Sequence, residues 1–151
     1  MGRAATEEGF LLPLRDEEGQ GFWEGALRGE LRIQACGSCD RLRFPPRPMC
    51  PHCRSTDSQW KTMSGRGTIW SFVVAHPPLL EAYQSVAPYN VVVVALDEDP
   101  LIRLVGNLVA SEEGPINEVD PATIRIGDPV RVVFQTIADD VALPRWVLES
   151  S

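Results

Sequence analysis

Cys36-Gly-Ser-Cys39 and Cys50-Pro-His-Cys53 are two matched pairs that hold all four cysteines of this 151-residue chain. Two Cys-x-x-Cys pairs separated by ten residues have the spacing of a zinc ribbon, in which two tight turns present four thiolates to one tetrahedral ion. Two disulfides and a redox-active Cys-x-x-Cys are the alternative interpretations. The duplicated pair favours metal, because a redox motif usually stands alone at the start of a helix.

Four thiolates would close the coordination sphere of the ion. The sequence therefore predicts one structural Zn²⁺ per chain, with no open position for water or substrate. The ligands would be Cys36, Cys39, Cys50 and Cys53, and His52 is expected to be a turn residue. A lobe of about thirty residues has too little apolar core to fold without its metal.

The charge of the chain is unevenly distributed. The net charge is −7, yet residues 28–66 hold eight basic and three acidic side chains, and residues 67–151 hold four basic and twelve acidic ones. The positive segment is either an ordinary solvated surface or an anion-binding one. The longest apolar run, Val91 to Leu96, is too short to span a membrane, and no apolar signal region precedes it. We therefore expect a cytoplasmic protein with reduced thiols.

The pattern along the chain predicts a mainly β protein in four parts. A helix should begin at Asp16, present Phe22 and Trp23 on one face and stop at Gly29. Short strands are expected around the cysteine pairs, at 31–35, 41–44 and 59–63. The expected parts are a flexible tail (1–15), an N-terminal helix (16–30), a zinc ribbon (31–63) and an OB-fold domain (64–151).

Five strand-like segments bounded by Gly, Pro or Asp follow the ribbon, at 68–76, 90–96, 101–109, 130–137 and 145–149. A short element near 120–126 links the third and fourth segments. Five strands with such a link favour a closed OB-like barrel over a sandwich, which usually needs seven. The loop 77–89 is long and apolar and contains Tyr83; it either covers its own barrel or binds a lipophilic ligand or protein.

The residues alone favour neither nucleic-acid binding nor catalysis. Residues 90–109 contain no aromatic side chain and only one basic one, Arg103, whereas nucleic-acid-binding barrels use both on these strands. A single-stranded nucleic-acid-binding ribbon and barrel stays as the alternative function. His76 is the one plausible general base, and it stands alone in the sequence, so we expect a protein that is not itself an enzyme.

Four short motifs carry a family resemblance when taken in order with the cysteine pairs. They are Phe22-Trp23-Glu24-Gly25, Phe44-Pro45-Pro46-Arg47-Pro48, Ser64-Gly65-Arg66-Gly67 and Ile126-Gly127-Asp128-Pro129-Val130. With them, residues 18–149 resemble the zinc-ribbon and OB-fold, acyl-CoA-associated family, formerly a domain of unknown function, that accompanies thiolase-like and lipid-transfer-protein-like enzymes.

The resemblance implies a rubredoxin-like ribbon and a non-catalytic scaffold subunit. Its partner would be a thiolase-like enzyme, such as an acyltransferase, a condensing enzyme or a steroid side-chain aldolase, whose acyl-CoA site it helps to form. Some relatives are fused to hydratases or bridge consecutive enzymes, so a hydratase is a second candidate partner. The expected partner or acyl-CoA contacts are Phe22, Trp23, Arg41, Arg43, Arg47 and Tyr83.

Overall fold

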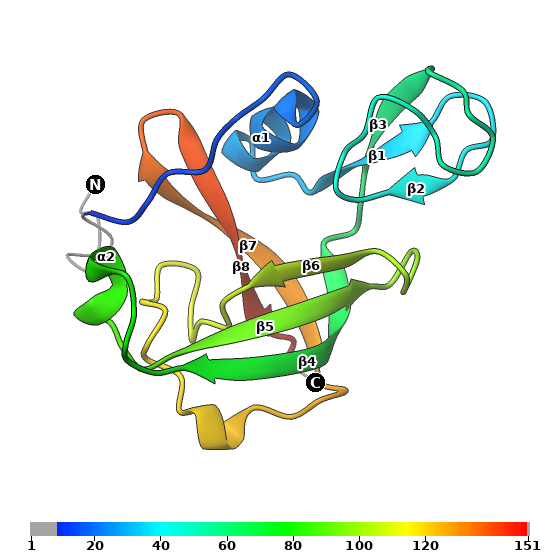
Figure 1. Ribbon diagram of the computed structural model, residues 1–151. Coiled ribbons are helices and arrows are strands. Elements are labelled where there is room, and N and C mark those ends of the chain that lie inside the picture. The colour runs from blue at the N-terminus through cyan, green and yellow to red at the C-terminus, as the bar shows by residue number, and fades with distance from the viewer. Residues whose placement is uncertain (1–8, 151) are drawn as a thin grey trace.

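The computed structural model describes residues 9–150, so most of the expected tail lies outside the described residues. A small three-stranded sheet and a five-stranded barrel lie at opposite ends of the molecule. The helix α1 (Gln20–Leu27) lies in the angle between the small sheet and the hairpin formed by the last two barrel strands (Figure 1). The mainly β architecture with an N-terminal helix is as predicted.

The small sheet is the expected ribbon. Its strands are β1 (Arg32–Cys36), β2 (Leu42–Arg43) and β3 (Ser58–Thr62), in the antiparallel order β2-β1-β3. The central strand β1 is almost completely buried, because it lies between β2 and β3 and α1 also packs against it. Each strand lies within one or two residues of its predicted bounds, since the cysteine turns define where the strands end.

Helix α1 begins later than predicted. The Asp16 carboxylate does cap a turn, accepting a hydrogen bond from the Gly19 N–H at 2.8 Å, but this turn precedes the helix. The helix ends at Leu27, and Gly29, with a positive φ of 74°, stops it as expected. A Schellman motif forms there, in which the Gly29 N–H donates to the Ala26 carbonyl and the Glu30 N–H donates to the Gly25 carbonyl. Gly21 lets the helix approach β3 closely, because a Cβ there would lie 2.2 Å from the Trp60 ring.

The barrel has five antiparallel strands in the order β6-β5-β4-β7-β8. They are β4 (Arg66–Ala75), β5 (Tyr89–Leu96), β6 (Arg103–Gly106), β7 (Pro129–Ala138) and β8 (Val141–Leu148). A parallel bridge between Leu108 and Trp146 joins the two ends of this order and nearly closes the barrel. This is the topology of an OB fold, as predicted. The linking element is the 3₁₀ turn η1 (Pro121–Thr123), capped by the side chain of Asp120.

Two strand predictions miss a boundary. Strand β8 begins at Val141, four residues before the predicted start, because Asp139 and Asp140 form a tight turn that pairs Ala138 directly with Val141. Strand β6 ends at Gly106, and the chain then continues only as the isolated bridge at Leu108. The long connection between β4 and β5 contains one short helix, α2 (Glu81–Gln84).

Two apolar clusters fill the molecule. The larger runs from Phe22 of α1 through the ribbon strand β1 to the barrel core around Trp146, so ribbon, helix and barrel share one core. The smaller cluster lies at the other end of the barrel and includes Phe10, whose ring stacks on Tyr83 with centroids 5.1 Å apart. Residues 9–15 thus differ from the expected loose tail, because Phe10 is buried and Arg15 pairs with Asp140.

The connection from ribbon to barrel is braced by a side chain of the β5–β6 hairpin. The Glu98 carboxylate accepts hydrogen bonds from the backbone N–H of Ser64 at 3.1 Å and from its hydroxyl at 2.7 Å. Ser64 lies between β3 and β4, where the chain leaves the ribbon. The hairpin tip therefore holds the linker in place.

Candidate functional site

The four cysteines converge on one point. Their sulfur atoms all lie within 4.8 Å of one another, with Cys36 and Cys53 at 3.5 Å and Cys39 and Cys50 at 3.7 Å. All four are free thiols. The first pair follows the end of β1, where the sulfur of Cys36 accepts hydrogen bonds from the backbone N–H groups of Ser38 and Cys39. His52 lies outside the cluster, and its Nδ1 lies 2.8 Å from Nη1 of Arg41.

The electrostatics of the cluster suit a cation. The backbone N–H groups of Cys39 and Ser38 stabilise the Cys36 thiolate and lower the pKa of that thiol to about 6. The pKa of Cys50 is lowered too, chiefly by the backbone N–H of Cys53. Ser55 would by itself lower the pKa of Cys53, but the adjacent Cys36 and the two other thiols raise it to about 11. Neighbouring negative charges therefore oppose complete ionisation, and a bound cation would remove that opposition. The four cysteines fit a structural metal site.

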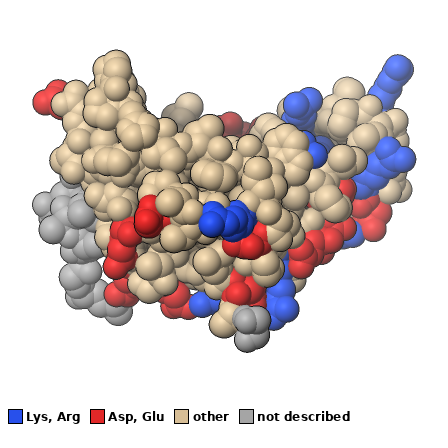
Figure 2. Space-filling view, turned by 90° about the horizontal axis from the view of Figure 1, so that it is seen from below, with Lys and Arg blue, Asp and Glu red and all other residues tan. Residues whose placement is uncertain are grey.

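The three arginines expected to contact an anion differ in their surroundings. Arg43 is buried, and its guanidinium donates to Oε1 of Gln34 at 2.8 Å and to the backbone carbonyl of Arg47 at 3.0 Å. Arg43 is thus engaged inside the ribbon and not available at its surface, because the β1–β2 pairing places it against Gln34. The side chains of Arg41 and Arg47 are exposed, and Figure 2 shows Lys and Arg concentrated at the ribbon end of the molecule, on the right.

The three aromatic residues expected at a partner contact also differ in their surroundings. Phe22 is only 6% exposed and packs against Trp23 and Phe44, with centroids 5.0 and 5.7 Å away. It therefore forms part of this chain's own core and does not present the surface that we expected. Tyr83 is half-buried in the smaller cluster, against Phe10. Trp23 keeps part of its ring exposed.

His76 lies just beyond the end of β4, with its side chain exposed. Within residues 9–150, no hydrogen bond or ion pair joins it to another side chain. The described part of the chain therefore gives this histidine no group that would orient it as a general base.

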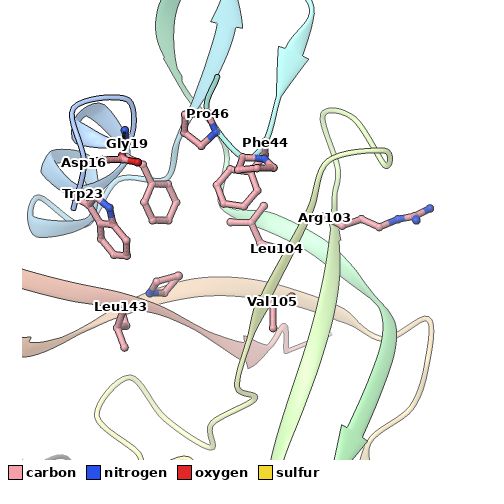
Figure 3. A pocket seen from close by; sticks show the side chains of 12 residues that line it. Asp16, Gly19, Trp23, Phe44, Pro46, Arg103, Leu104, Val105 and Leu143 are labelled. Carbon is pink, nitrogen blue, oxygen red and sulfur yellow. Dashed lines mark hydrogen bonds between the residues drawn. The ribbon is translucent and has the colours of Figure 1, made fainter. Parts of the chain in front are cut away.

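A pocket that sequence analysis missed lies where helix, ribbon and barrel meet. Its volume is about 400 Å³. Figure 3 shows Trp23, Phe44, Leu104, Val105 and Leu143 around a shared space. The lining residues come from four separate parts of the chain: the start of α1, the segment after β2, strand β6 and strand β8. No local pattern could have grouped them.

An apolar surface covers the outside of the barrel on β4, β5 and β6. The register places Val73 beside Val91, and Val93 beside Val105, on the face opposite the buried Val92 and Val94. We call Val73, Val91, Val93 and Val105 the valine face. Val73 is 61% exposed and Val105 is 63% exposed. Trp70 protrudes beside it at a β-bulge, with the guanidinium of Arg103 stacked over its ring at 3.8 Å.

Fold and metal site together define a class of protein, a rubredoxin-like ribbon joined to an OB-fold barrel. Two family models match the chain: the rubredoxin-like zinc ribbon domain of ChsH2 over residues 23–58, and the C-terminal OB-fold domain of ChsH2 over residues 60–135. The chain belongs to this ChsH2-type, or DUF35, family of zinc-ribbon and OB-fold proteins.

Relatives in the family have several kinds of name. A probable enoyl-CoA hydratase alpha subunit of Thermomonospora curvata is 39% identical over 82% of this chain and 35% of its own length. A 3-oxo-4,17-pregnadiene-20-carboxyl-CoA hydratase alpha subunit of Mycobacterium tuberculosis is 33% identical over 93% of this chain and 39% of its own. The chain thus spans little more than a third of these two relatives. A DUF35 domain-containing scaffold protein of Methanothermobacter thermautotrophicus is 35% identical over 75% of this chain and 77% of its own.

A solved structure resembles nearly the whole chain. A chain of the structure described as Ltp2-ChsH2(DUF35) aldolase superposes with a TM-score of 0.77 and 34% identity, covering 91% of this chain and 98% of that one. Relatives of this protein are therefore named as alpha subunits of hydratases that act on CoA thioesters, as a scaffold protein and as part of an aldolase. None of the helices in residues 9–150 is long and apolar enough to cross a membrane.

Proposed function

We propose that this chain is a non-catalytic scaffold subunit that binds a thiolase-like or lipid-transfer-protein-like enzyme and helps to form its acyl-CoA site. The observation that carries the proposal is the valine face, an uncharged sheet surface on which Val73 and Val105 are more than half exposed in the described structure and Val91 and Val93 are partly exposed. Contiguous exposed apolar surfaces on soluble proteins commonly mark protein contacts. The solved relative described as Ltp2-ChsH2(DUF35) aldolase supports an enzyme of that kind as the partner.

The partner's reaction would be an acyl transfer, a condensation or an aldol cleavage. A hydratase is a second candidate partner, because two relatives are named as hydratase alpha subunits. Exposed Arg41 and Arg47 would contribute positive charge near the phosphates of coenzyme A, and Trp23 and Tyr83 would lie toward the partner.

Zinc would have a structural role in this complex. Four converging thiols prefer a soft, tetrahedral ion, and four sulfur ligands leave no position for water or substrate. One Zn²⁺ per chain would fix the two cysteine turns and, through β1, the surface on which α1 packs. Such a site works in the cytoplasm, where thiols stay reduced.

Co-expression with a candidate thiolase-like enzyme tests the proposal. The two proteins should co-purify in a fixed ratio. Val73→Asp should weaken the complex at least about tenfold, because the interface would bury an unpaired charge. Leu14→Asp is the control, since Leu14 is 92% exposed and lies on the N-terminal segment, which is not part of the valine face.

Two results would contradict the scaffold function. Salt-sensitive oligonucleotide binding by a chain that fails to join any enzyme would support the single-stranded nucleic-acid alternative. Acyl-CoA turnover by the isolated chain, abolished by His76→Ala, would show that the chain is itself an enzyme. For a scaffold, the isolated chain is inactive and His76→Ala leaves the activity of the complex unchanged.

A further inference from the structure

The pocket between α1, the ribbon and the barrel is formed by elements that cannot easily change their separation. Phe44 and Pro46 follow β2, Val105 belongs to β6, and Leu143 belongs to β8. The aromatic rings that form part of the wall pack against one another, with Phe22 in contact with both Trp23 and Phe44. A pocket held by three packed units exists before any ligand arrives, and its volume of about 400 Å³ falls within the usual range for ligand sites.

The walls offer almost nothing to a polar ligand. Asp16 and Arg103 are the charged residues among those that line the pocket. Oδ1 of Asp16 already accepts the Gly19 N–H, and the Arg103 guanidinium lies over Trp70 and points away from the space in Figure 3. The remaining wall is aliphatic, aromatic or proline. The wall gives water few hydrogen-bonding partners, so an apolar group that displaces this water gains free energy.

The charge at the mouth selects against anions. The Asp16 carboxylate lies on the rim, and Glu17 and Glu18 follow it with exposed side chains. A phosphate or nucleotide at this mouth would meet the Asp16 carboxylate, with Glu17 and Glu18 next to it in the chain, and its one cationic neighbour in the lining would be Arg103, which is stacked on Trp70. The pocket therefore lacks a cluster of cations that would hold the phosphates of coenzyme A.

We infer that this pocket is a small-molecule binding site for an uncharged aliphatic or alicyclic group. The ligand places its apolar body between Trp23, Phe44, Val105 and Leu143 and keeps any polar end outside. The site belongs to this chain alone and needs no enzyme partner. Dye binding by the isolated chain and co-purification with an enzyme are separate measurements, although Val105 belongs both to the pocket wall and to the valine face.

Fluorescence titration with N-phenyl-1-naphthylamine tests the site, because this uncharged dye brightens in apolar surroundings. The full chain should bind the dye at one site, 1-octanol should displace it, and free coenzyme A should not. Val105→Asp should weaken dye binding at least about tenfold by placing a charge in the wall. Val105→Trp should weaken it by filling the space.

Val73→Asp is the matched control, because Val73 is as exposed as Val105 and lies on the same outer surface but not in the pocket. It should change dye affinity less than about twofold, within the usual effect of a surface substitution. Circular dichroism spectra of the three variants are compared with that of the wild-type chain to check that each variant folds. The inference is overturned if the wild-type chain does not bind the dye, or if Val73→Asp weakens binding as much as Val105→Asp.

Discussion

Leu108 and Trp146 form a parallel bridge that joins the segment after β6 to strand β8. Two backbone hydrogen bonds support it, from Val109 N–H to the Trp146 carbonyl at 2.8 Å and from Trp146 N–H to the Asn107 carbonyl at 3.0 Å. The Trp146 side chain is completely buried at this seam. One residue therefore supplies both the bridge that nearly closes the barrel and the centre of its core.

Replacing Trp146 with alanine should destabilise the whole molecule. We expect Trp146→Ala to lower the free energy of unfolding by about 3–5 kcal/mol, because a large cavity opens in the shared core. Urea denaturation followed by far-ultraviolet circular dichroism measures the change. Trp70→Ala is the control: Trp70 is 51% exposed, and its loss should cost about 1 kcal/mol or less. Equal effects of the two variants would contradict the assigned role of the seam.

Removing one thiol should empty the metal site. The purified chain should contain about one zinc ion, as measured by inductively coupled plasma mass spectrometry. Cys39→Ser should lose that ion and unfold the ribbon, while amide resonances of β4 to β8 persist. Ser38→Ala changes a neighbouring side chain that is not a ligand and should keep the metal. A folded ribbon in metal-free Cys39→Ser protein would disprove structural zinc.

Gln34 should contribute more to the stability of the folded chain than an uncharged side chain usually does. Its Oε1 accepts hydrogen bonds from Nε of Arg43 at 2.8 Å and from the backbone N–H of Arg47 at 2.7 Å. Nη1 of Arg43 is already buried without a partner, so Gln34→Leu would leave a buried cation still less satisfied. We expect Gln34→Leu to lower the free energy of unfolding by about 1–3 kcal/mol, as measured by thermal denaturation. The double variant Gln34→Leu/Arg43→Leu should recover part of it, and no recovery would argue against the pair.

The N-terminal segment should contribute to stability through one ring. Phe10 is 9% exposed and packs in the smaller cluster with Tyr83. Phe10→Ala should therefore cost about 3 kcal/mol of unfolding free energy in a urea titration. Leu14→Ala, four residues on and 92% exposed, should cost almost nothing. A loss of the same size in both variants would mean that the segment acts as a whole and not through Phe10.

Much of the fold could be predicted from local patterns. The cysteine pairs define the ribbon because a four-thiol site requires two tight turns at a known spacing. Alternation of buried and exposed residues along 89–96 identifies β5, since the side-chain period of a strand is two. The early start of β8 was missed because Pro144 interrupts its pattern, although its side chain sits opposite Phe134 in the hairpin.

The binding surfaces could not be predicted in the same way. Phe22 and Arg43 have sequence features typical of contact residues, yet tertiary packing buries both, against Phe44 and Gln34 respectively. The apolar pocket depends on pairing between β6 and β5 and between β8 and β7, which bring Val105 and Leu143 near Phe44. Such long-range placement leaves no trace in the spacing of the residues.

The contact of Glu98 with Ser64 has a mechanical consequence. The carboxylate holds the point where the chain leaves the ribbon, and the same hairpin continues into β6, which carries Leu104 and Val105. A swing of the ribbon about Ser64 would therefore pull on the hairpin and alter the gap between Phe44 and Val105. Glu98 thus helps to keep the ribbon and the barrel at a fixed separation, and with it the width of a pocket to which Glu98 contributes no atom.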